Sequence, residues 1–493
     1  MLSLMRHLFA VLILAAVPLF AQSEVGKVSF ANSGAPQAQE AFARGLALLH
    51  NFEYSDAFDA FREAQRLDPD FAMAYWGEAM THNHPIWFRQ DAAAARAVLA
   101  RLDRKGKMTE RERDYLATLD VLYAEGPKND RDLKYAEAMR ALHEKYPDDV
   151  DARAFYALAL LGTAHEGRDF ATYMRAASLL EEVFPANQRH PGVLHYLIHS
   201  YDDPVHAPLG MRAAKLYGAV APNAAHALHM TSHIFVAMAM WDDVIDANRR
   251  AIDVVNRQRA ARGRPAQDCG HYPTWLHYGY LQKNRTDDAR KALDACRAFA
   301  SRAKEKNFFD EYAEMRAHHV ATGYGLTEAA EIPEEFVEAR YALAYADALG
   351  GADAEGAVAR LRALQPAVLA LAAKETNPSK RIRAEVMLQQ AEALLLIAQG
   401  KRNEALPILE AAAKAERGMP LEFGPPVIPK PAGEMYAEQL LAAGRAADAV
   451  AAYDDVFART PGRTVAVDGY ARARKAAGER VAEEKPARAV HEH

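Results

Sequence analysis

The chain has 493 residues, and its 66 acidic residues slightly outnumber its 60 lysines and arginines, which gives a formal net charge of −6. A small acidic excess over this length argues against nucleic acid and against an anionic membrane surface as partners. The length predicts several domains or one long repeat array.

The N-terminus has the pattern of a secretory signal peptide. Arg6 precedes the apolar run Leu8–Phe20, and the small residue Ala21 follows it. This run is too short for a transmembrane helix, which needs about 20 apolar residues. We therefore expect residues 1–21 to be removed and the mature chain to be exported, to a bacterial periplasm, with no membrane span of its own.

Helical periodicity with a repeat follows the predicted signal peptide. Gly45, Ala57, Phe61, Ala64 and Pro69 fall at positions 8, 20, 24, 27 and 32 of a 34-residue unit. Small residues at positions 8, 20 and 27 let two antiparallel helices approach closely, and the aromatic residue at position 24 fills the gap between them. The pattern resembles the tetratricopeptide repeat (TPR). The resemblance implies an all-α, TPR-type α-solenoid, a superhelical stack of antiparallel helix hairpins.

The array is expected to have three parts between the signal peptide and a charged, disordered tail. Their ranges are residues 22–190 for the N-terminal hairpins, 191–300 for the central hairpins, 301–477 for the C-terminal hairpins and 478–493 for the tail. Residues 418–433 contain five prolines and cannot be helical throughout. We interpret this segment as an extended connector in preference to a lid over the groove.

Histidines are concentrated in the central part. Seven of the 19 histidines lie between His190 and His233. Extending the repeat register gives positions in the first helix of each hairpin. His195 and His199 take positions 2 and 6 of one unit, His226, His229 and His233 take positions 2, 5 and 9 of the next, and His271 takes position 2 of the third. In TPR proteins such positions face the concave groove, so the resemblance implies that the six side chains converge there.

Imidazole groups converging from neighbouring helices indicate a transition-metal site. Pairs such as His195/His199 and His229/His233 can direct two nitrogens at one ion, and nitrogen ligands favour zinc, copper or iron over calcium and magnesium. The sequence does not distinguish among the three metals. Weaker candidates for the same site are His190, His206, His82 and His84, whereas His277 is assigned a structural role.

Two functions remain open. Asp202 and Asp203 are candidate general bases if the metal activates water for a hydrolase, and copper or iron suggests an oxidase instead. The alternative is a scaffold that binds a peptide or partner protein in the groove without catalysis. Whether the chain is an enzyme therefore stays undecided.

A narrower resemblance rests on two motifs, HPGVLHYLIH from residue 190 and HALHMTSHIF from residue 226. They are similar to paired motifs in a group of exported bacterial TPR proteins, and FGPPVIPKP from residue 423 is similar as well. Thr231 stands where that pattern has proline. The resemblance implies no catalytic residues, because no activity is established for the group.

The two cysteines, Cys269 and Cys296, are placed for a possible disulfide. Cys269 precedes a predicted first helix and Cys296 ends its partner, and these ends are neighbours in an antiparallel hairpin. Export to an oxidising compartment would permit the bond. Equally, Cys296 on its own fits a small buried slot at position 27.

Overall fold

The computed structural model describes residues 25–325, 327–351 and 353–478. The predicted signal peptide lies outside these residues, as does the predicted tail apart from Gly478. The described chain is an all-α TPR-type solenoid. In the described ranges, regular strands are limited to β1 (Asn83–His84) and β2 (Arg89–Gln90), which pair antiparallel after the third helix.

The helices follow one another with short connections. The first half contains α1 (Gln39–His50), α2 (Tyr54–Leu67), α3 (Ala72–Met80), α4 (Ala92–Leu99), α5 (Glu110–Leu122), α6 (Lys128–Lys145), α7 (Val150–Leu161), α8 (Phe170–Glu181), α9 (Pro191–Tyr201), α10 (Ala207–Val220) and α11 (Ala225–Ala237). The second half contains α12 (Trp241–Ala261), α13 (His271–Gln282), α14 (Thr286–Ala303), α15 (Lys306–Ala321), α16 (Val337–Gly350), α17 (Ala354–Ala372), α18 (Ser379–Ala398), α19 (Arg402–Arg417), α20 (Ala432–Ala442), α21 (Ala446–Phe457) and α22 (Thr464–Ala476). Short 3-10 helices are η1 (Pro36–Ala38), η2 (Pro85–Trp87) and η3 (Phe184–Ala186).

The first hairpin shows why the repeat pattern folds as it does. Phe61 on α2 is fully buried. A Cβ atom on Gly77 of α3 would lie 2.3 Å from Phe61 Cε1, and one on Gly45 of α1 would lie 2.9 Å from Phe61 Cδ1. The ring therefore fills the space that the two glycines leave between three helices, which fixes their close approach.

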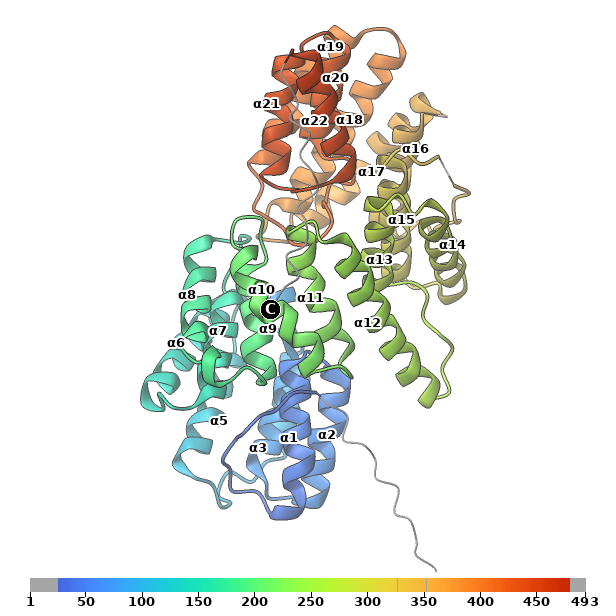
Figure 1. The fold of residues 1–493 in the computed structure, drawn as a ribbon. Coiled ribbons are helices and arrows are strands. Elements are labelled where there is room, and N and C mark those ends of the chain that lie inside the picture. The colour runs from blue at the N-terminus through green and yellow to red at the C-terminus, as the bar shows by residue number, and fades with distance from the viewer. Residues whose placement is uncertain (1–24, 326, 352, 479–493) are drawn as a thin grey trace, which may run out of the picture.

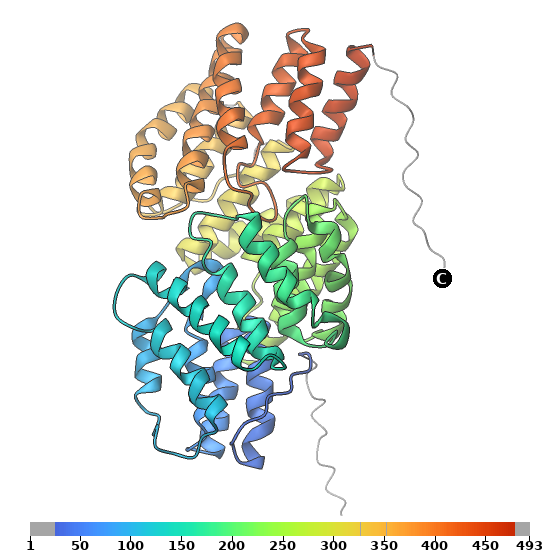
Figure 2. The ribbon, with the colours of Figure 1, turned by 90° about the vertical axis from the view of Figure 1, so that its left-hand side faces the viewer.

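The array curves so that distant hairpins meet. The N-terminal helices lie at one end of the molecule and α16–α22 at the other, with α9–α13 between them (Figures 1 and 2). Helix α9 packs against α1 as well as against α7 and α11. This contact brings the turn between α1 and α2 onto the inner face of the central hairpins.

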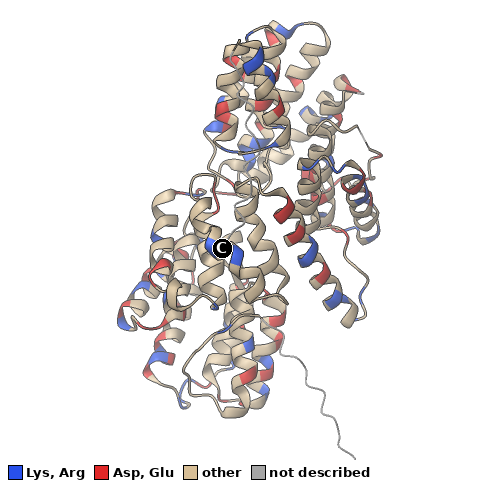
Figure 3. Ribbon diagram, viewed as in Figure 1, with Lys and Arg blue, Asp and Glu red and all other residues tan. Residues whose placement is uncertain are grey.

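The helices that carry the histidines are otherwise uncharged. Helices α9, α11 and α13 contain no Lys, Arg, Asp or Glu (Figure 3). All of α9 is buried, as is α11 from Ala225 to Val236. The amphipathic pattern is thus replaced by a pattern typical of helices surrounded by protein. No helix in the described ranges is both long and apolar enough to span a membrane.

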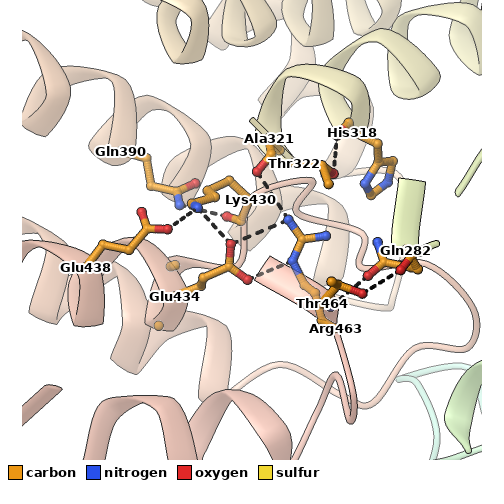
Figure 4. A network of polar contacts seen from close by, with 12 residues as sticks. Gln282, His318, Ala321, Thr322, Gln390, Lys430, Glu434, Glu438, Arg463 and Thr464 are labelled. Atoms are coloured by element: carbon orange, nitrogen blue, oxygen red, sulfur yellow. Dashed lines mark hydrogen bonds and ion pairs between the residues drawn. The ribbon is translucent and has the colours of Figure 1, made fainter. Parts of the chain in front are cut away.

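A buried polar network joins the central hairpins to the C-terminal ones (Figure 4). Lys430 Nζ contacts Glu434 at 2.7 Å, and Arg463 Nε donates to the same carboxylate at 2.7 Å. Next to Arg463, the Thr464 hydroxyl donates to the backbone carbonyl of Gln282 on α13 at 2.7 Å. These bonds hold the C-terminal end of the proline-rich segment 418–433 in place.

Candidate metal centre

The structure brings the six predicted histidines together in two adjoining groups of three. We call His195, His199 and His226 the closed triad, and His229, His233 and His271 the open triad. Within each triad, one ligand nitrogen from each ring lies within 4.8 Å of the other two. The side chains come from α9, α11 and α13, as the repeat register predicts.

The rings within each triad are in contact, and the two triads touch each other. The ring centroids of His195 and His226 are 5.0 Å apart in the closed triad, and those of His229 and His233 are 4.9 Å apart in the open triad. Across the boundary, the His226 and His229 centroids are separated by 6.0 Å. All six imidazoles therefore form one continuous cluster.

A hydrogen bond fixes which nitrogen of His195 carries the proton. Its Nδ1 lies 2.6 Å from the backbone oxygen of His50. A carbonyl oxygen can only accept, so Nδ1–H must donate. In the neutral ring, Nε2 then carries the lone pair. The Nε2 atom of His195 is therefore the nitrogen available to a ligand.

The same assignment holds for two members of the open triad. His229 Nδ1 lies 2.8 Å from Asn248 Oδ1, and the Asn248 amide group donates to the Val244 carbonyl, which fixes the amide orientation. His233 Nδ1 donates to Asp202 Oδ2 at 2.5 Å. The Nε2 atoms of His229 and His233 are 3.0 Å apart. Two lone pairs at this distance require a proton or a cation between them.

The closed triad is notable for buried nitrogens that lack partners. Within the described residues, the Nε2 atoms of His195, His199 and His226 have no hydrogen-bond partner. Burial lowers the pKa of His195 to about 3 and lowers the pKa of His199 and of His226 well below the ordinary value. The rings are therefore neutral, and their Nε2 atoms are the groups that need a partner.

Two segments from outside the central hairpins cover the cluster. Phe52, in the turn between α1 and α2, packs against His195 with ring centroids 4.3 Å apart. From the proline-rich segment, Phe423 lies 5.2 Å from His233, and Gly424 passes so close to Trp275 that a Cβ atom there would be 2.2 Å from Trp275 Cζ2. The segment predicted as a connector therefore also closes one side of the site.

The turn before α2 contributes a carboxylate as well. Glu53 Oε1 accepts the backbone N–H of His226 at 2.9 Å. Burial raises the pKa of Glu53 to about 7, against the lowering effect of this hydrogen bond. Tyr217 also donates to Asn51 at 2.7 Å, which anchors the turn. No sequence motif marks this turn as part of the site, because its contact with α11 spans 173 positions.

Both predicted general bases already accept hydrogen bonds from protein side chains. Asp202 orients His233 through the 2.5 Å bond described above. Asp203 accepts from Arg168 at 3.1 Å and from His206 at 2.9 Å. Both carboxylates are buried, with 1% exposure each. The structure thus gives Asp202 a positioning role beside the open triad and places Asp203 in a separate ion-pair cluster.

The weaker candidates lie outside both triads. His206 belongs to the Asp203 cluster, His82 packs near Phe58, and His84 stacks on Tyr54 with centroids 3.9 Å apart. His277 is paired with His319, at 3.3 Å between Nε2 and Nδ1.

His190 belongs to a third group, which no sequence motif predicts and which we call the aspartate trio (His50, Asp151 and His190). The Nε2 atoms of His50 and His190 lie 2.9 and 3.2 Å from Asp151 Oδ1. The signal for His50 was present: counting from Gly45 at position 8, it occupies position 13, which faces the groove in TPR proteins.

The structure joins Cys269 and Cys296 in a disulfide. Cys269 lies two residues before His271, and both cysteines are fully buried. The bond links the start of α13 to α14. It therefore restrains the backbone that carries the third histidine of the open triad.

Nitrogen donors arranged in this way suit zinc, copper, iron or nickel. For a tetrahedral ion with metal–nitrogen distances of about 2.0–2.1 Å, neighbouring nitrogens are about 3.3 Å apart. The 3.0 Å separation in the open triad is near this value. Hydrogen bonds from Nδ1 to a carboxylate, an amide and a carbonyl are the usual outer partners of metal-binding imidazoles.

Comparison with known proteins gives weak structural similarity only. No protein-family profile matches the chain, and no curated protein sequence matches it. Among solved structures, yeast Tom70 is 13% identical and covers 90% of this chain and 89% of its own, with a TM-score of 0.33. The Cut9 chain of the APC/C hetero-tetramer Cut9–Hcn1 is 12% identical over 90% of this chain and 78% of its own (TM-score 0.37), and the P58(IPK) TPR domain is 12% identical over 90% and 98% (TM-score 0.21). These TM-scores are too low to place any residue of the histidine cluster by analogy.

Proposed function

We propose that this protein is a TPR-type scaffold that binds a transition-metal ion, namely zinc, copper or iron, through its central histidine cluster. The observation that carries the proposal is the convergence of His195, His199 and His226. One ring nitrogen of each lies within 4.8 Å of the other two, and the buried Nε2 atoms of all three have no hydrogen-bond partner in the described ranges. A neutral core would normally pair such nitrogens.

A shared proton is the main physical alternative to a metal. In the closed triad it would turn one ring into an imidazolium, and burial, which lowers the pKa of all three of its histidines, strongly disfavours a positive charge there. A divalent ion is also charged, yet it gains three or more direct nitrogen bonds and lies near the carboxylates of Asp202 and Glu53. The geometry therefore favours a metal over a proton.

Metal binding is better supported than either catalysis or peptide binding at this site. Hydrolysis needs a free base, whereas Asp202 and Asp203 are committed to His233 and Arg168. A peptide would need access to the groove, but Phe52 and Phe423 pack directly on the histidines. Export to a periplasm remains part of the proposal, because it rests on the N-terminal sequence pattern.

Elemental analysis of the purified, untagged protein tests the proposal. We expect at least one transition-metal ion per chain, or uptake of Zn²⁺ at this ratio after chelation and reloading. The variant His199→Leu should lose the metal held by the closed triad. His82→Ala, which removes a histidine outside the cluster, should retain the wild-type content. Less than about 0.2 ion per chain after reloading a folded wild-type protein would overturn the proposal.

A further inference from the structure

We infer that the cluster holds two ions in unequal sites: the closed triad encloses one, and the open triad presents the other to an external ligand. This inference rests on the proposed metal-binding function and specifies what the site does with its metal. Six imidazoles exceed the ligand number of one tetrahedral ion. The ligand atoms also separate into two groups of three by distance.

The hydrogen bonds that orient the rings are likewise divided between the triads. In the closed triad, His195 is oriented by the backbone carbonyl of His50 on α1. In the open triad, His229 is oriented by Asn248 on α12, and His233 by Asp202 after α9. The orienting groups come from different elements, so each triad has its own support.

Each triad also has its own neighbouring carboxylate. Glu53 accepts the backbone N–H of His226 beside the closed triad, and Asp202 bonds to His233 in the open triad. Two divalent ions bound only by neutral imidazoles would repel each other strongly in a buried cluster. Asp202, and Glu53 in its ionised form, place negative charge near the two sites and reduce that repulsion.

Solvent exposure distinguishes the two sites. His195, His199 and His226 are 0%, 4% and 7% exposed, whereas His271 is an exposed residue. An ion in the open triad would therefore have three protein ligands, one of them on an exposed residue. Three protein ligands plus an exchangeable fourth position is the arrangement that lets a metal take water or a small anion. The Phe52 ring covers the closed triad. Among the described residues, an external ligand therefore has no comparable way to reach an ion there.

The chemical class expected at the open site is a small anionic or neutral donor that can enter beside His271. Trp275, Tyr272 and Phe423 line this side, with Trp275 and the His271 ring 5.6 Å apart. We therefore use azide as the probe, because it is small, anionic and a good metal ligand.

Metal stoichiometry and azide binding in matched variants test this assignment. The chelated wild type, reloaded with Zn²⁺, should hold two ions per chain. His199→Leu and His271→Ala should each hold one. With Co²⁺ in place of Zn²⁺, azide should change the visible spectrum of the wild type and of His199→Leu, but not of His271→Ala. His226→Leu replaces His199→Leu if the latter does not fold, while the exposed position of His271 makes its variant a mild change.

The outcomes separate this inference from the function on which it rests. One ion per chain in the wild type, or loss of all metal in either single variant, overturns the two-site assignment but leaves metal binding intact. An azide response retained in His271→Ala also overturns it, because the exchangeable ion would then lie elsewhere. No metal in any folded form overturns both the inference and the proposed function.

Discussion

The aspartate trio and the closed triad are neighbouring groups of buried side chains, and the backbone carbonyl of His50 links them through its bond to His195. In the trio, every imidazole nitrogen has a partner. Asp151 accepts from both Nε2 atoms, the Tyr196 hydroxyl lies 2.9 Å from His50 Nδ1, and His190 Nδ1 accepts the Val193 N–H at 3.3 Å. The trio is complete without any ligand.

The closed triad differs from the trio in bonding, not in proximity. Both groups place three potential ligand atoms within 4.8 Å. Of the two groups, only the closed triad has buried Nε2 atoms without hydrogen-bond partners among the described residues. Distance alone would assign a metal to both groups. The count of satisfied nitrogens assigns it to the closed triad and gives the trio a structural role.

The largest effect expected from this comparison is on stability, at the trio. Asp151→Ala leaves two buried imidazole N–H groups without an acceptor, so we expect the free energy of unfolding to fall by about 4 kcal/mol. Chemical denaturation of the chelated protein measures it. Asp148→Ala, an exposed aspartate three positions earlier, should change it by less than about 0.5 kcal/mol. A loss below about 1 kcal/mol for Asp151→Ala would contradict the structural role of the trio.

The second-largest effect on stability is expected from the disulfide, which lies on the side of the cluster away from the aspartate trio. Replacing both Cys269 and Cys296 with serine removes a cross-link between residues 27 positions apart. In the chain-entropy model this costs about 3.5 kcal/mol of stability. We also expect weaker metal binding at the open triad, because the start of α13 is less restrained near His271. Denaturation with and without Zn²⁺ tests both effects, and an unchanged stability in the serine variant would refute the first.

A smaller effect is expected where a carboxylate orients a metal ligand instead of completing a structural group. Asp202→Asn keeps an oxygen for His233 but removes the charge. Loss of such an outer partner typically weakens metal affinity by about 10–100-fold, which corresponds to about 1.4–2.7 kcal/mol. Competition with a chromophoric chelator for Zn²⁺ measures the change. Asp253→Asn on the exposed face of α12 serves as the control. Equal Zn²⁺ affinities of the Asp202→Asn and Asp253→Asn variants would show that Asp202 does not contribute to metal binding.

The sequence was sufficient for the local part of this site but not for its distant contacts. Repeat register placed six histidines on one face because helical geometry relates residues within a hairpin. It could not predict that the turn at Phe52 enters the central hairpins, since that depends on the curvature summed over α1–α9. The contact of Phe423 with the cluster could not be predicted either. Its segment has no periodicity, and its position depends on the Lys430–Glu434–Arg463 network. Asp151 carries no motif at all.

The smallest predicted effect concerns Glu416, whose pKa is shifted in the opposite direction to that of Asp151. Burial alone would raise the pKa of Asp151, but hydrogen bonds from His190 and His50 hold it well below the ordinary value. Burial raises the pKa of Glu416 to about 7, although the backbone N–H of Ala432 donates to it. The stability that Asp151 contributes is therefore present above its unfolded-state pKa and lost in acid. The stability that Glu416 contributes is present below its unfolded-state pKa and lost as pH rises through about 7.

Glu416→Gln separates these two cases, because glutamine keeps the acceptor oxygen and never ionises. We expect the variant and the wild type to be equally stable at pH 5. By pH 8 the variant should be more stable by about 1 kcal/mol, a value reduced for the partial exposure of the side chain. Denaturation at the two pH values measures the difference, with the exposed Glu410→Gln on the same helix as control. A variant that is instead less stable at pH 8 would mean that the ionised carboxylate is the form the fold requires, as it is at Asp151.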